Sequence, residues 1–476
     1  MNVRRAKIIA TLGPSSNTVD VISELIKAGM NCARVNMSHG THEGHKKTIQ
    51  NIREASRLVN REVAILVDLQ GPKIRVDKLP EALELKAGDT WYIGHSAVIK
   101  NYPEHKNRFI PTIYEELVSD AQVGARILFD DGNLEAQAIN KTDDLLEIKI
   151  IEGGILKSNK GINLPNVKVS APSFTSKDEE DLVFALEQDI DYVAISFVRT
   201  VDDIKKIQNF IKAKGHDIPV VAKIEKPEAL ENIDDIIYHA NMIMIARGDM
   251  GVEVGNHLVP SIQKDIIRRC NLVGRPVITA TQMLESMIDH SRPTRAEASD
   301  VANAIWDGTD IVMLSAETAS GKFPMQAVRM MGQIMIEAEK NPKDRPLLRN
   351  QELVGVTQTM QVAAALVAEK ISAKWILSVT ETGRSCFKMT RFRPSTRVLG
   401  VTRSIQAVRA MCLYWGIAPF YLDSKGNDLE SVEKEMIEIL KQKNLVTKGD
   451  KIVVTHGRGS YFNEGSTNLV RVEEIV

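Results

Sequence analysis

The most informative stretch of this chain is Pro219-Val220-Val221-Ala222-Lys223-Ile224-Glu225-Lys226-Pro227. Its run of apolar and small residues predicts a fully buried β-strand. Because side chains alternate between the two faces of a strand, Lys223 and Glu225 point to the same side. Opposite charges at the end of an apolar strand are costly to bury unless they meet a ligand or a metal. The pair is therefore either an ordinary ion pair at a loop edge or part of a binding site.

The composition is typical of a globular protein with more than one domain. The chain has 476 residues, more than one hydrophobic core usually supports, with 43% hydrophobic and 26% charged residues. A formal net charge of −1 argues against a nucleic-acid partner. The four cysteines have neither metal-ligand nor disulfide spacing, which indicates reduced thiols. No signal peptide or membrane span is evident, so we expect a cytoplasmic protein without a membrane partner.

Short apolar runs alternate with amphipathic stretches on both sides of the opening strand. This alternation is typical of βα units and a parallel sheet. Eight such strands predict a closed (β/α)8 barrel of the TIM type, and an open doubly wound sheet is the alternative. The predicted strands are Lys7–Leu12, Asn31–Met37, Val63–Leu69, Asp191–Val198, Val220–Ile224, Met242–Ala246, Pro276–Ala280 and Asp310–Leu314. The predicted helices between them include Val19–Ala28, Asp178–Glu187, Val201–Lys214, His257–Val273 and Arg295–Trp306.

Two interruptions divide the chain into three domains. After Asp68 the helical pattern gives way to β-type segments, which predicts a small β-barrel lid inserted into a barrel loop. A Pro-rich, charged segment at 341–346 marks a second boundary, beyond which an α/β pattern restarts. We therefore expect a catalytic barrel over residues 1–69 and 168–342, a lid domain over 70–167, and a C-terminal α/β regulatory domain over 343–476.

Polar side chains follow seven of the eight predicted strands. Active sites of (β/α)8 barrels lie at the C-terminal ends of the strands. One polar residue there could simply cap a loop, but their coincidence at so many ends favours an enzyme. These strand-end residues include Arg34, Asn36, Ser38, His39, Asp68, Ser196, Lys223, Glu225, Arg247, Asp249, Thr279, Thr281, Ser315 and Glu317.

The residue types at these ends indicate phosphoryl transfer. Glu225 and Asp249 follow adjacent strands and are hard oxygen ligands suited to Mg²⁺ or Mn²⁺. Arg34, Arg75 and Lys223 supply positive charge for phosphate and carboxylate oxygens. A metal flanked by several cations neutralises the charge of a transferring phosphoryl group.

Sequence motifs along the whole chain resemble those of pyruvate kinases. A barrel with an inserted lid and a C-terminal α/β domain is also the architecture of that family. The resemblance implies transfer of a phosphoryl group from phosphoenolpyruvate to ADP, giving pyruvate and ATP, by a homotetramer. The motifs include Arg34-Val35-Asn36-Met37-Ser38-His39-Gly40, Gly71-Pro72-Lys73-Ile74-Arg75, Asn159-Lys160-Gly161-Ile162-Asn163, Val221-Ala222-Lys223-Ile224-Glu225-Lys226, Ala246-Arg247-Gly248-Asp249, Ile278-Thr279-Ala280-Thr281-Gln282-Met283 and Arg292-Pro293-Thr294-Arg295-Ala296-Glu297.

The resemblance also implies roles for the catalytic residues. Glu225 and Asp249 would hold the divalent metal. Lys223 would neutralise the transferring phosphoryl group and the enolate left behind. Thr281 would help to deliver the proton to the enolate carbon, and it would act through water, with Ser315 nearby, because a threonine hydroxyl is a weak acid.

Other residues would bind the substrates. By resemblance, Arg34 orients the substrate phosphate and Ser196 lies beside the substrate. The main-chain amides of Arg247, Gly248 and Asp249, at the start of a helix, would receive the substrate carboxylate. The nucleotide phosphates would be contacted by Arg75, His39, Lys160 and Asn36.

One departure from the family pattern concerns a monovalent cation. Members that need K⁺ bind it through residues matching Asn36, Ser38, Asp68 and the carbonyl of Leu69. They commonly carry Glu at the position of Lys73. Because an ammonium carries the same unit charge as K⁺, Lys73 predicts activity without added K⁺.

The C-terminal domain suggests regulation by a phosphorylated effector. The loop Thr380-Glu381-Thr382-Gly383-Arg384-Ser385 follows a predicted strand and opens a helix, which fits either a phosphate-binding nest or a plain capped turn. It resembles the effector loop of the family, and the segment around Gly457 and Gly465 resembles the facing loop. Members activated by fructose 1,6-bisphosphate often carry Lys in place of Glu381. Since Glu381 would repel a second phosphate, we expect a sugar monophosphate or AMP.

Two further functions stay open at the level of sequence. One is another metal-dependent barrel enzyme that acts on phosphoenolpyruvate or pyruvate. The other is a non-catalytic sugar-phosphate sensor that has kept the fold. Pyruvate release that depends on ADP would distinguish a pyruvate kinase from both of these alternatives.

Overall fold

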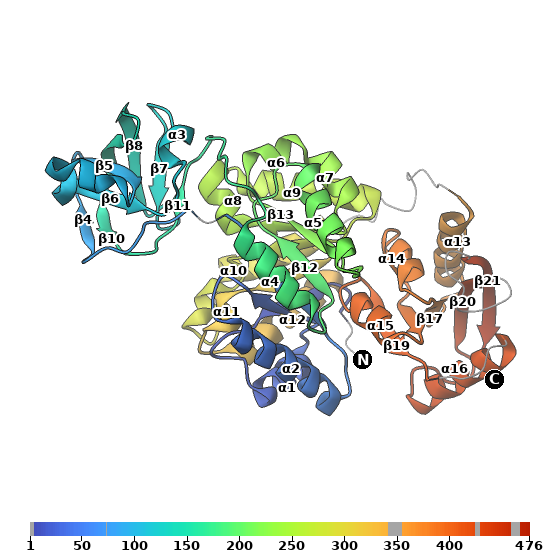
Figure 1. Cartoon of the computed structure of the whole chain (residues 1–476). Coiled ribbons are helices and arrows are strands. Elements are labelled where there is room, and N and C mark those ends of the chain that lie inside the picture. Colours follow the sequence, from blue (N-terminus) through green and yellow to red (C-terminus); the bar gives the residue numbers. More distant parts are fainter. Residues whose placement is uncertain (1–3, 73, 341–354, 424–428, 458–466) are drawn as a thin grey trace.

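The computed structural model describes residues 4–72, 74–340, 355–423, 429–457 and 467–476. Figure 1 shows a central barrel with a small β domain on one side and an α/β domain on the other. Within the described residues we find no helix with both the length and the hydropathy that a bilayer span requires. All four cysteines are buried free thiols.

Eight parallel strands close the barrel in the order β1-β16-β15-β14-β13-β12-β3-β2. β1 pairs with β2 on one side and with β16 on the other, so no edge is open. The predicted (β/α)8 barrel is thus confirmed, and the alternative of an open sheet is wrong. The strands are β1 (Lys7–Thr11), β2 (Cys32–Asn36), β3 (Ala64–Asp68), β12 (Tyr192–Ile195), β13 (Val220–Ile224), β14 (Met242–Ala246), β15 (Val277–Ala280) and β16 (Ile311–Leu314).

Helices with one apolar face cover the outside of the barrel (Figure 1). Helix α1 begins where the Thr18 side chain accepts a hydrogen bond from the amide of Val21, and it ends at Gly29 with φ 124°. Ile22 and Leu25 form part of its buried face. The helices of the barrel are α1 (Val19–Ala28), α2 (His42–Val59), α4 (Ser176–Leu186), α5 (Val201–Ala213), α6 (Pro227–Glu231), α7 (Ile233–His239), α8 (Arg247–Val254), α9 (Val259–Val273), η3 (Glu285–Ile288), α10 (Arg295–Asp307), α11 (Ala316–Ala319) and α12 (Pro324–Lys340).

The chain between β3 and α4 forms the small β domain, called the lid below. Its main sheet has the order β11-β7-β8-β9-β5-β6, and β4 pairs with β10 separately. The sequence did not predict β4, β6, β10 or β11, because two to four residues carry too little periodicity. The elements are β4 (Leu83–Leu85), β5 (Thr90–His95), η1 (Val98–Asn101), η2 (Pro103–Arg108), β6 (Phe109–Thr112), α3 (Leu117–Asp120), β7 (Arg126–Phe129), β8 (Leu134–Lys141), β9 (Leu146–Glu152), β10 (Gly154–Leu156) and β11 (Ile162–Asn163).

The C-terminal domain is built on a five-stranded sheet with the order β19-β18-β17-β20-β21. The sequence did not predict its two edge strands: β19 contains Pro419, and β21 carries many charged residues. Both features are common on edge strands, because they discourage further pairing, but they weaken the strand pattern. The elements are α13 (Val356–Lys370), β17 (Trp375–Val379), α14 (Arg384–Thr390), β18 (Val398–Thr402), α15 (Ile405–Met411), β19 (Ile417–Tyr421), α16 (Leu429–Gln442), β20 (Lys451–Gly457) and β21 (Thr467–Glu474).

The C-terminal domain closes the floor of the barrel, where the strands begin. Cys412 and Leu413 pack into the same hydrophobic cluster as Ile9 and Leu66 of the barrel interior. Tyr192 of β12 donates a hydrogen bond to the carbonyl of Ala410 at 2.8 Å. The opposite end of the barrel, where the strands finish, faces the lid.

Candidate active site

The C-terminal ends of β2, β3 and β13 bring four charged side chains together. Asn36 pairs with Asp68 in the parallel register of β2 and β3, and Arg34 lies on the same face two residues earlier. Arg34 Nε is 2.7 Å from Asp68 Oδ2. Lys223 Nζ is 2.9 Å from Glu225 Oε1 and 3.5 Å from Asp68 Oδ1. Four of the charged residues predicted from sequence, Arg34, Asp68, Lys223 and Glu225, thus form one cluster.

Lys223 is kept charged by its neighbours. Burial alone would lower the pKa of Lys223, but Asp68, Glu225 and Asp249 raise it above its ordinary value. Burial would also raise the pKa of Asp68, yet Lys223 and Arg34 bring it below its ordinary value. Glu225 differs, because burial and the charge of Asp249 raise its pKa in spite of Lys223. This side of the cluster would be stabilised by a further cation.

The donor atoms fit a divalent metal ion. Glu225 Oε2 accepts a hydrogen bond from the amide of Phe197 at 2.7 Å, which orients the carboxylate. Within the described residues, Glu225 Oε1 and Asp68 Oδ1 are buried and accept no hydrogen bond of normal geometry. No group of three or more His, Cys, Asp or Glu side chains in the described ranges could enclose a metal. Glu225 and Asp249 would therefore share the ion with substrate oxygens and water, as Mg²⁺ sites commonly do.

Strained backbone marks the ends of two barrel strands, β12 and β15, which are separated by β13 and β14. Phe197 after β12 has φ 55°, and Thr281 and Gln282 after β15 have φ 66° and 52°. Non-glycine residues reach such values only where the surrounding structure holds them, and they cluster at functional sites. The sequence could not reveal this strain, because nothing in these residue types requires a positive φ.

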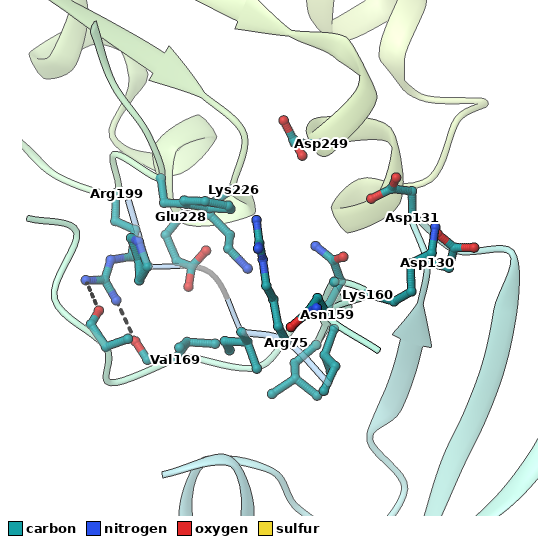
Figure 2. A pocket seen from close by; sticks show the side chains of 18 residues that line it. Arg75, Asp130, Asp131, Asn159, Lys160, Val169, Arg199, Lys226, Glu228 and Asp249 are labelled. Atoms are coloured by element: carbon teal, nitrogen blue, oxygen red, sulfur yellow. Dashed lines mark hydrogen bonds and ion pairs between the residues drawn. The ribbon is translucent and has the colours of Figure 1, made fainter. Parts of the chain in front are cut away.

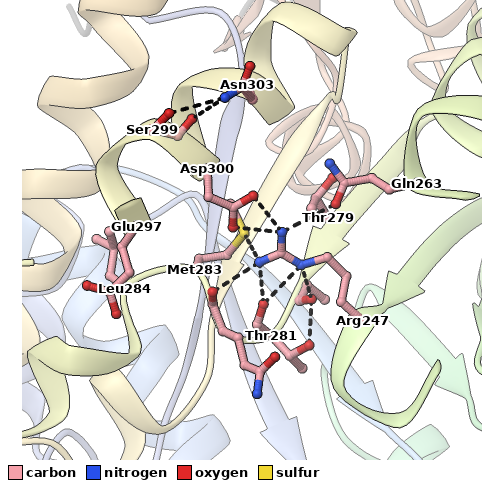
Figure 3. A network of polar contacts seen from close by, with 12 residues as sticks. Arg247, Gln263, Thr279, Thr281, Met283, Leu284, Glu297, Ser299, Asp300 and Asn303 are labelled. Atoms are coloured by element: carbon pink, nitrogen blue, oxygen red, sulfur yellow. Dashed lines mark hydrogen bonds and ion pairs between the residues drawn. The ribbon is translucent and has the colours of Figure 1, made fainter. Parts of the chain in front are cut away.

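Arg247 holds the strained loop after β15 (Figure 3). Its guanidinium donates to the carbonyls of Thr281 and Gln282 at 2.7 and 3.1 Å. It also binds both carboxylate oxygens of Asp300, at 2.9 and 2.7 Å. The sequence predicted a role for the main-chain amide of Arg247 in binding the substrate carboxylate, but none for its side chain. The planar fork of arginine allows it to satisfy these acceptors together, so Arg247 positions Thr281.

The hydroxyl of Thr281 connects two strand ends. Its oxygen accepts a hydrogen bond from the amide of Gly248 at 2.9 Å and donates its proton to the carbonyl of Ala280 at 2.6 Å. Gly248 and Asp249 lie in the first turn of α8. The Gly248 amide, expected to receive a substrate carboxylate, is thus held by Thr281 in this structure.

The two predicted serines have different surroundings. Ser196 accepts a hydrogen bond from Lys223 Nζ at 2.7 Å and donates to the carbonyl of Leu69 at 2.9 Å. The hydroxyl of Ser315 is buried and has no hydrogen-bond partner among the described residues, while its amide donates to Glu317 Oε2 at 2.6 Å. Burial raises the pKa of Glu317, which also accepts a bond from the amide of Leu284. Glu317 thus supports the strand-end loops.

A cavity of about 240 Å³ lies between the barrel end and the lid (Figure 2). Arg75 and Lys160 line it from the lid side, and Asp249 lines it from the barrel. Lys160 Nζ is 2.7 Å from Asp130 Oδ1, so the Asp130 carboxylate partly balances the charge of Lys160. Phe197, whose amide holds Glu225, also lines the cavity, which joins the cavity to the charged cluster. Sequence reasoning did not select several other lining residues: Asp130, Asp131, Asn159, Asn163, Arg199, Lys226 and Glu228.

Contacts of Glu253 join the lid to the barrel. Glu253 is 3% exposed and accepts hydrogen bonds from Lys226 Nζ at 2.7 Å and from Asn163 Nδ2 at 2.9 Å. Asn163 belongs to β11, the last strand of the lid, whereas Lys226 follows the barrel strand β13. Only the folded chain brings these residues together, since they are far apart in sequence.

The residues predicted to hold a monovalent cation lie at the ends of β2 and β3. Asn36 Oδ1 accepts a hydrogen bond from the amide of Ser38 at 3.1 Å, and the amide of His39 donates to the Asn36 carbonyl at 3.5 Å. Asp68 is part of the charged cluster described above, and the Leu69 carbonyl joins that cluster through Ser196. Lys73, the predicted substitute for K⁺, lies outside the described residues.

The predicted effector loop folds back on itself at the end of β17. Gly383 has φ 81°, and its amide donates to the Thr380 hydroxyl at 3.0 Å. The Ser385 and Thr467 hydroxyls lie 2.9 Å apart, which joins the loop to β21. The Glu381 carbonyl accepts a hydrogen bond from Thr402 at 3.1 Å, and Thr382 is exposed. Most of the predicted facing loop, residues 458–466, lies outside the described residues.

Comparison with known proteins agrees with this architecture. The family model described as the barrel domain of pyruvate kinase matches residues 3–328, and the one described as its alpha/beta domain matches residues 358–473. The pyruvate kinase of Geobacillus stearothermophilus is 41% identical over 485 residues, which cover 99% of this chain and 80% of the relative. The pyruvate kinase of Staphylococcus haemolyticus is 39% identical, covering 99% of this chain and 81% of the relative. Pyruvate kinase 2 of Synechocystis is 41% identical, covering 99% and 79%. The chain therefore belongs to the pyruvate kinase family.

Proposed function

We propose that this protein transfers the phosphoryl group of phosphoenolpyruvate to ADP, giving pyruvate and ATP, the last step of glycolysis. The observation that carries the proposal is the buried cluster around Lys223, which adjoins a cavity lined by the cations Arg75 and Lys160. Cations converging on one cavity suit a reaction in which both substrates are phosphorylated. The names of the relatives support the same activity.

In the proposed reaction the bond between phosphorus and the enol oxygen breaks, and a bond from phosphorus to a terminal oxygen of ADP forms. Lys223 stabilises the negative charge that develops on the transferred group and on the enolate. Arg34, held by Asp68, orients the substrate phosphate. Burial of these groups strengthens each attraction, because little water competes with it.

The enolate then takes up a proton at carbon. The Thr281 proton already points to the Ala280 carbonyl, so Thr281 positions the water that gives the proton rather than giving it alone. The buried Ser315 hydroxyl is a second group that could bind this water.

A divalent ion, Mg²⁺ or Mn²⁺, would neutralise the substrate carboxylate and phosphate when bound. Glu225 and Asp249 are the residues that would hold it. Glu225 is oriented by the Phe197 amide through Oε2, and its Oε1 forms an ion pair with Lys223 at 2.9 Å. Arg75, Lys160, His39 and Asn36 would contact the phosphates of ADP as the lid approaches the barrel.

The activity is tested by following pyruvate release with lactate dehydrogenase. We expect release that requires phosphoenolpyruvate, ADP and a divalent metal together. Release without ADP would support the other barrel enzyme, and no release under any condition would support the sugar-phosphate sensor.

Activity without K⁺ is a finer part of the proposal. Lys73 would place its ammonium where other members hold K⁺, beside Asp68 and the Leu69 carbonyl. The wild type should keep its rate when an inert organic cation replaces K⁺, and Lys73→Glu should lose at least about tenfold unless K⁺ is added. A wild-type rate that collapses without K⁺ contradicts this assignment.

We also infer regulation by a phosphorylated effector at residues 380–385. The small and hydroxyl residues of this loop could receive one phosphate, and Glu381 would disfavour a second. Sugar monophosphates or AMP should therefore activate more strongly than fructose 1,6-bisphosphate in steady-state assays. A strong preference for the bisphosphate contradicts the inference. The homotetrameric state and the cytoplasmic location stay predictions.

A further inference from the structure

A second large cavity lies at the floor of the barrel, at the opposite end from the candidate active site. Its volume is about 730 Å³, roughly three times that of the cavity under the lid. The beginning of β1 lines it from the barrel, and β19 and α15 line it from the C-terminal domain. A molecule bound there would touch both domains.

Positive charge dominates this cavity, called the floor cavity below. Among the described residues, seven cationic side chains and one carboxylate line it. The carboxylate, Glu62, is engaged by Arg409, whose Nε lies 2.9 Å away. The lining therefore has an excess of cations that its own acid does not balance.

Three of these cations repel one another within the protein. Arg4 and Lys7 are 7% and 6% exposed, and Arg61 is mostly buried beside them. Burial and the charge of Arg61 lower the pKa of Arg4 to about 10. Burial lowers the pKa of Lys7 to about 7; Arg4 and Arg61 add to this effect, while Cys412 and Glu339 oppose it.

The hydrogen bonds of this group go mainly to neutral oxygens. Lys7 Nζ donates to the carbonyl of Ile417 at 2.7 Å, and Arg61 Nη1 donates to the carbonyl of Ile26 at 3.0 Å. Glu339 is the acid that opposes the charge of Arg4 and Lys7, but it already accepts bonds from the amides of Arg5 and Ala6. Three buried cations with so little compensation are unfavourable unless an anion enters.

Aromatic rings stand beside further cations in the floor cavity. The guanidinium of Arg397 lies 6.0 Å from the centre of the Trp375 ring. The ammonium of Lys443 lies 5.8 Å from the centre of the Phe420 ring. These rings offer an apolar surface next to positive charge, which suits an organic anion better than a bare inorganic one.

We propose that the floor cavity binds a phosphorylated metabolite that carries at least two negative charges. Lys7 and Arg61 bind its phosphate, and the aromatic residues contact its organic part. The site is distinct from the loop at residues 380–385, whose residues do not line this cavity. Its occupant links the barrel floor to the C-terminal domain and stabilises the contact between them.

Thermal unfolding of the full chain tests the proposal when binding at the effector loop is blocked. The exposed Thr382 is changed to Glu so that its carboxylate repels phosphate from that loop. Glucose 6-phosphate, AMP, citrate and glucose are then titrated separately as probes. We expect glucose 6-phosphate or AMP to raise the melting temperature saturably, and the stronger of the two distinguishes a sugar phosphate from a nucleotide.

Variants of the floor cavity supply the decisive comparison. In the Thr382→Glu background, Lys7→Met or Arg61→Gln should weaken the stabilisation at least about tenfold, the effect of losing one charge-assisted hydrogen bond. The control Arg268→Gln, at an exposed arginine paired with Asp265 on α9, should leave it unchanged. Stabilisation that survives both cavity variants, stabilisation by citrate alone, or none by any probe in the Thr382→Glu protein overturns the proposal.

Discussion

Two buried lysines at opposite ends of the same barrel have opposite electrostatic surroundings. Lys223, near the end of β13, lies among Asp68, Glu225 and Asp249, which raise its pKa above the ordinary value. Lys7, at the start of β1, lies beside Arg4 and Arg61, and its pKa falls to about 7. Both side chains are almost completely buried, so burial does not explain the difference.

The neighbouring charges decide what each lysine can do. At the catalytic end the carboxylates keep the ammonium charged and directed at the site, which suits a group that must stabilise developing charge. At the floor the ammonium is only weakly held and gains from an incoming anion. The function of a buried cation therefore depends on the charges that surround it as much as on its burial.

The largest expected effect is on kcat, and it distinguishes Lys223 from Lys7. Lys223→Met should lower kcat by about 10²–10³-fold or more, because a charged donor to the transition state is lost. The KM for phosphoenolpyruvate should change far less. Lys7→Met, the matched control at the floor, should keep kcat near the wild-type value in the lactate dehydrogenase-coupled assay. If the Lys223 variant changed only KM, we would conclude that Lys223 has a structural role.

The next effect concerns the carboxylate beside Lys223. Glu225→Gln removes a proposed metal ligand but keeps the size of the side chain. The metal concentration for half-maximal activity should rise at least about 100-fold. Direct Mn²⁺ binding, followed by electron paramagnetic resonance, should weaken in parallel. Unchanged Mn²⁺ binding contradicts the assignment of Glu225.

A smaller effect is expected at the residue that positions Thr281. Arg247→Lys keeps the charge but loses the fork that binds two carbonyls and Asp300 together. We expect kcat to fall roughly 10- to 100-fold through misplacement of the loop after β15, with a smaller change in KM. Hydrogen exchange at residues 281–284 should become faster in the variant. Unaltered exchange with the same kinetic loss would mean that Arg247 acts on the substrate directly.

The smallest effect is a change in stability with pH at the floor. Below about pH 7 Lys7 is charged in both the folded and the unfolded chain, and the folded chain carries the repulsion from Arg4 and Arg61. Between pH 7 and the ordinary lysine pKa of 10.5, only the unfolded chain keeps the proton, so the contribution of Lys7 to stability rises with pH. Without ligand, Lys7→Met should therefore melt about 2 °C or more above the wild type at pH 6.

The difference in melting temperature between Lys7→Met and the wild type should narrow as the pH rises, and calorimetry across the pH range measures it. Arg268→Gln serves as the control for the loss of an exposed cation. A Lys7→Met protein that is less stable than the wild type at pH 6 shows that the Ile417 hydrogen bond outweighs the repulsion.

Much of the barrel could be predicted from the chain alone. Each barrel strand is short and apolar, and helical segments follow all of them except β3, so the eight strands were predicted within a few residues. The short lid strands and the edge strands β19 and β21 were not, because their patterns are brief or masked by Pro419 and by charge. Pairing with neighbours that are distant in sequence creates these elements.

The candidate site divides in the same way. The residue pattern indicates which residues stand at strand ends, because alternation places Lys223 and Glu225 on one face and parallel strands end together. The strained backbone at Phe197 and Thr281, and the hydrogen bonds by which Arg247 holds the loop after β15, arise only from the tertiary fold. The imbalance of charge around Lys7 is also tertiary, since closure of the barrel brings Arg61 to that lysine and the C-terminal domain brings Ile417. Strands and helices can be predicted because their pattern depends on residues that are close in sequence. The electrostatic potential at a buried charge depends instead on all the charged groups that folding brings near it.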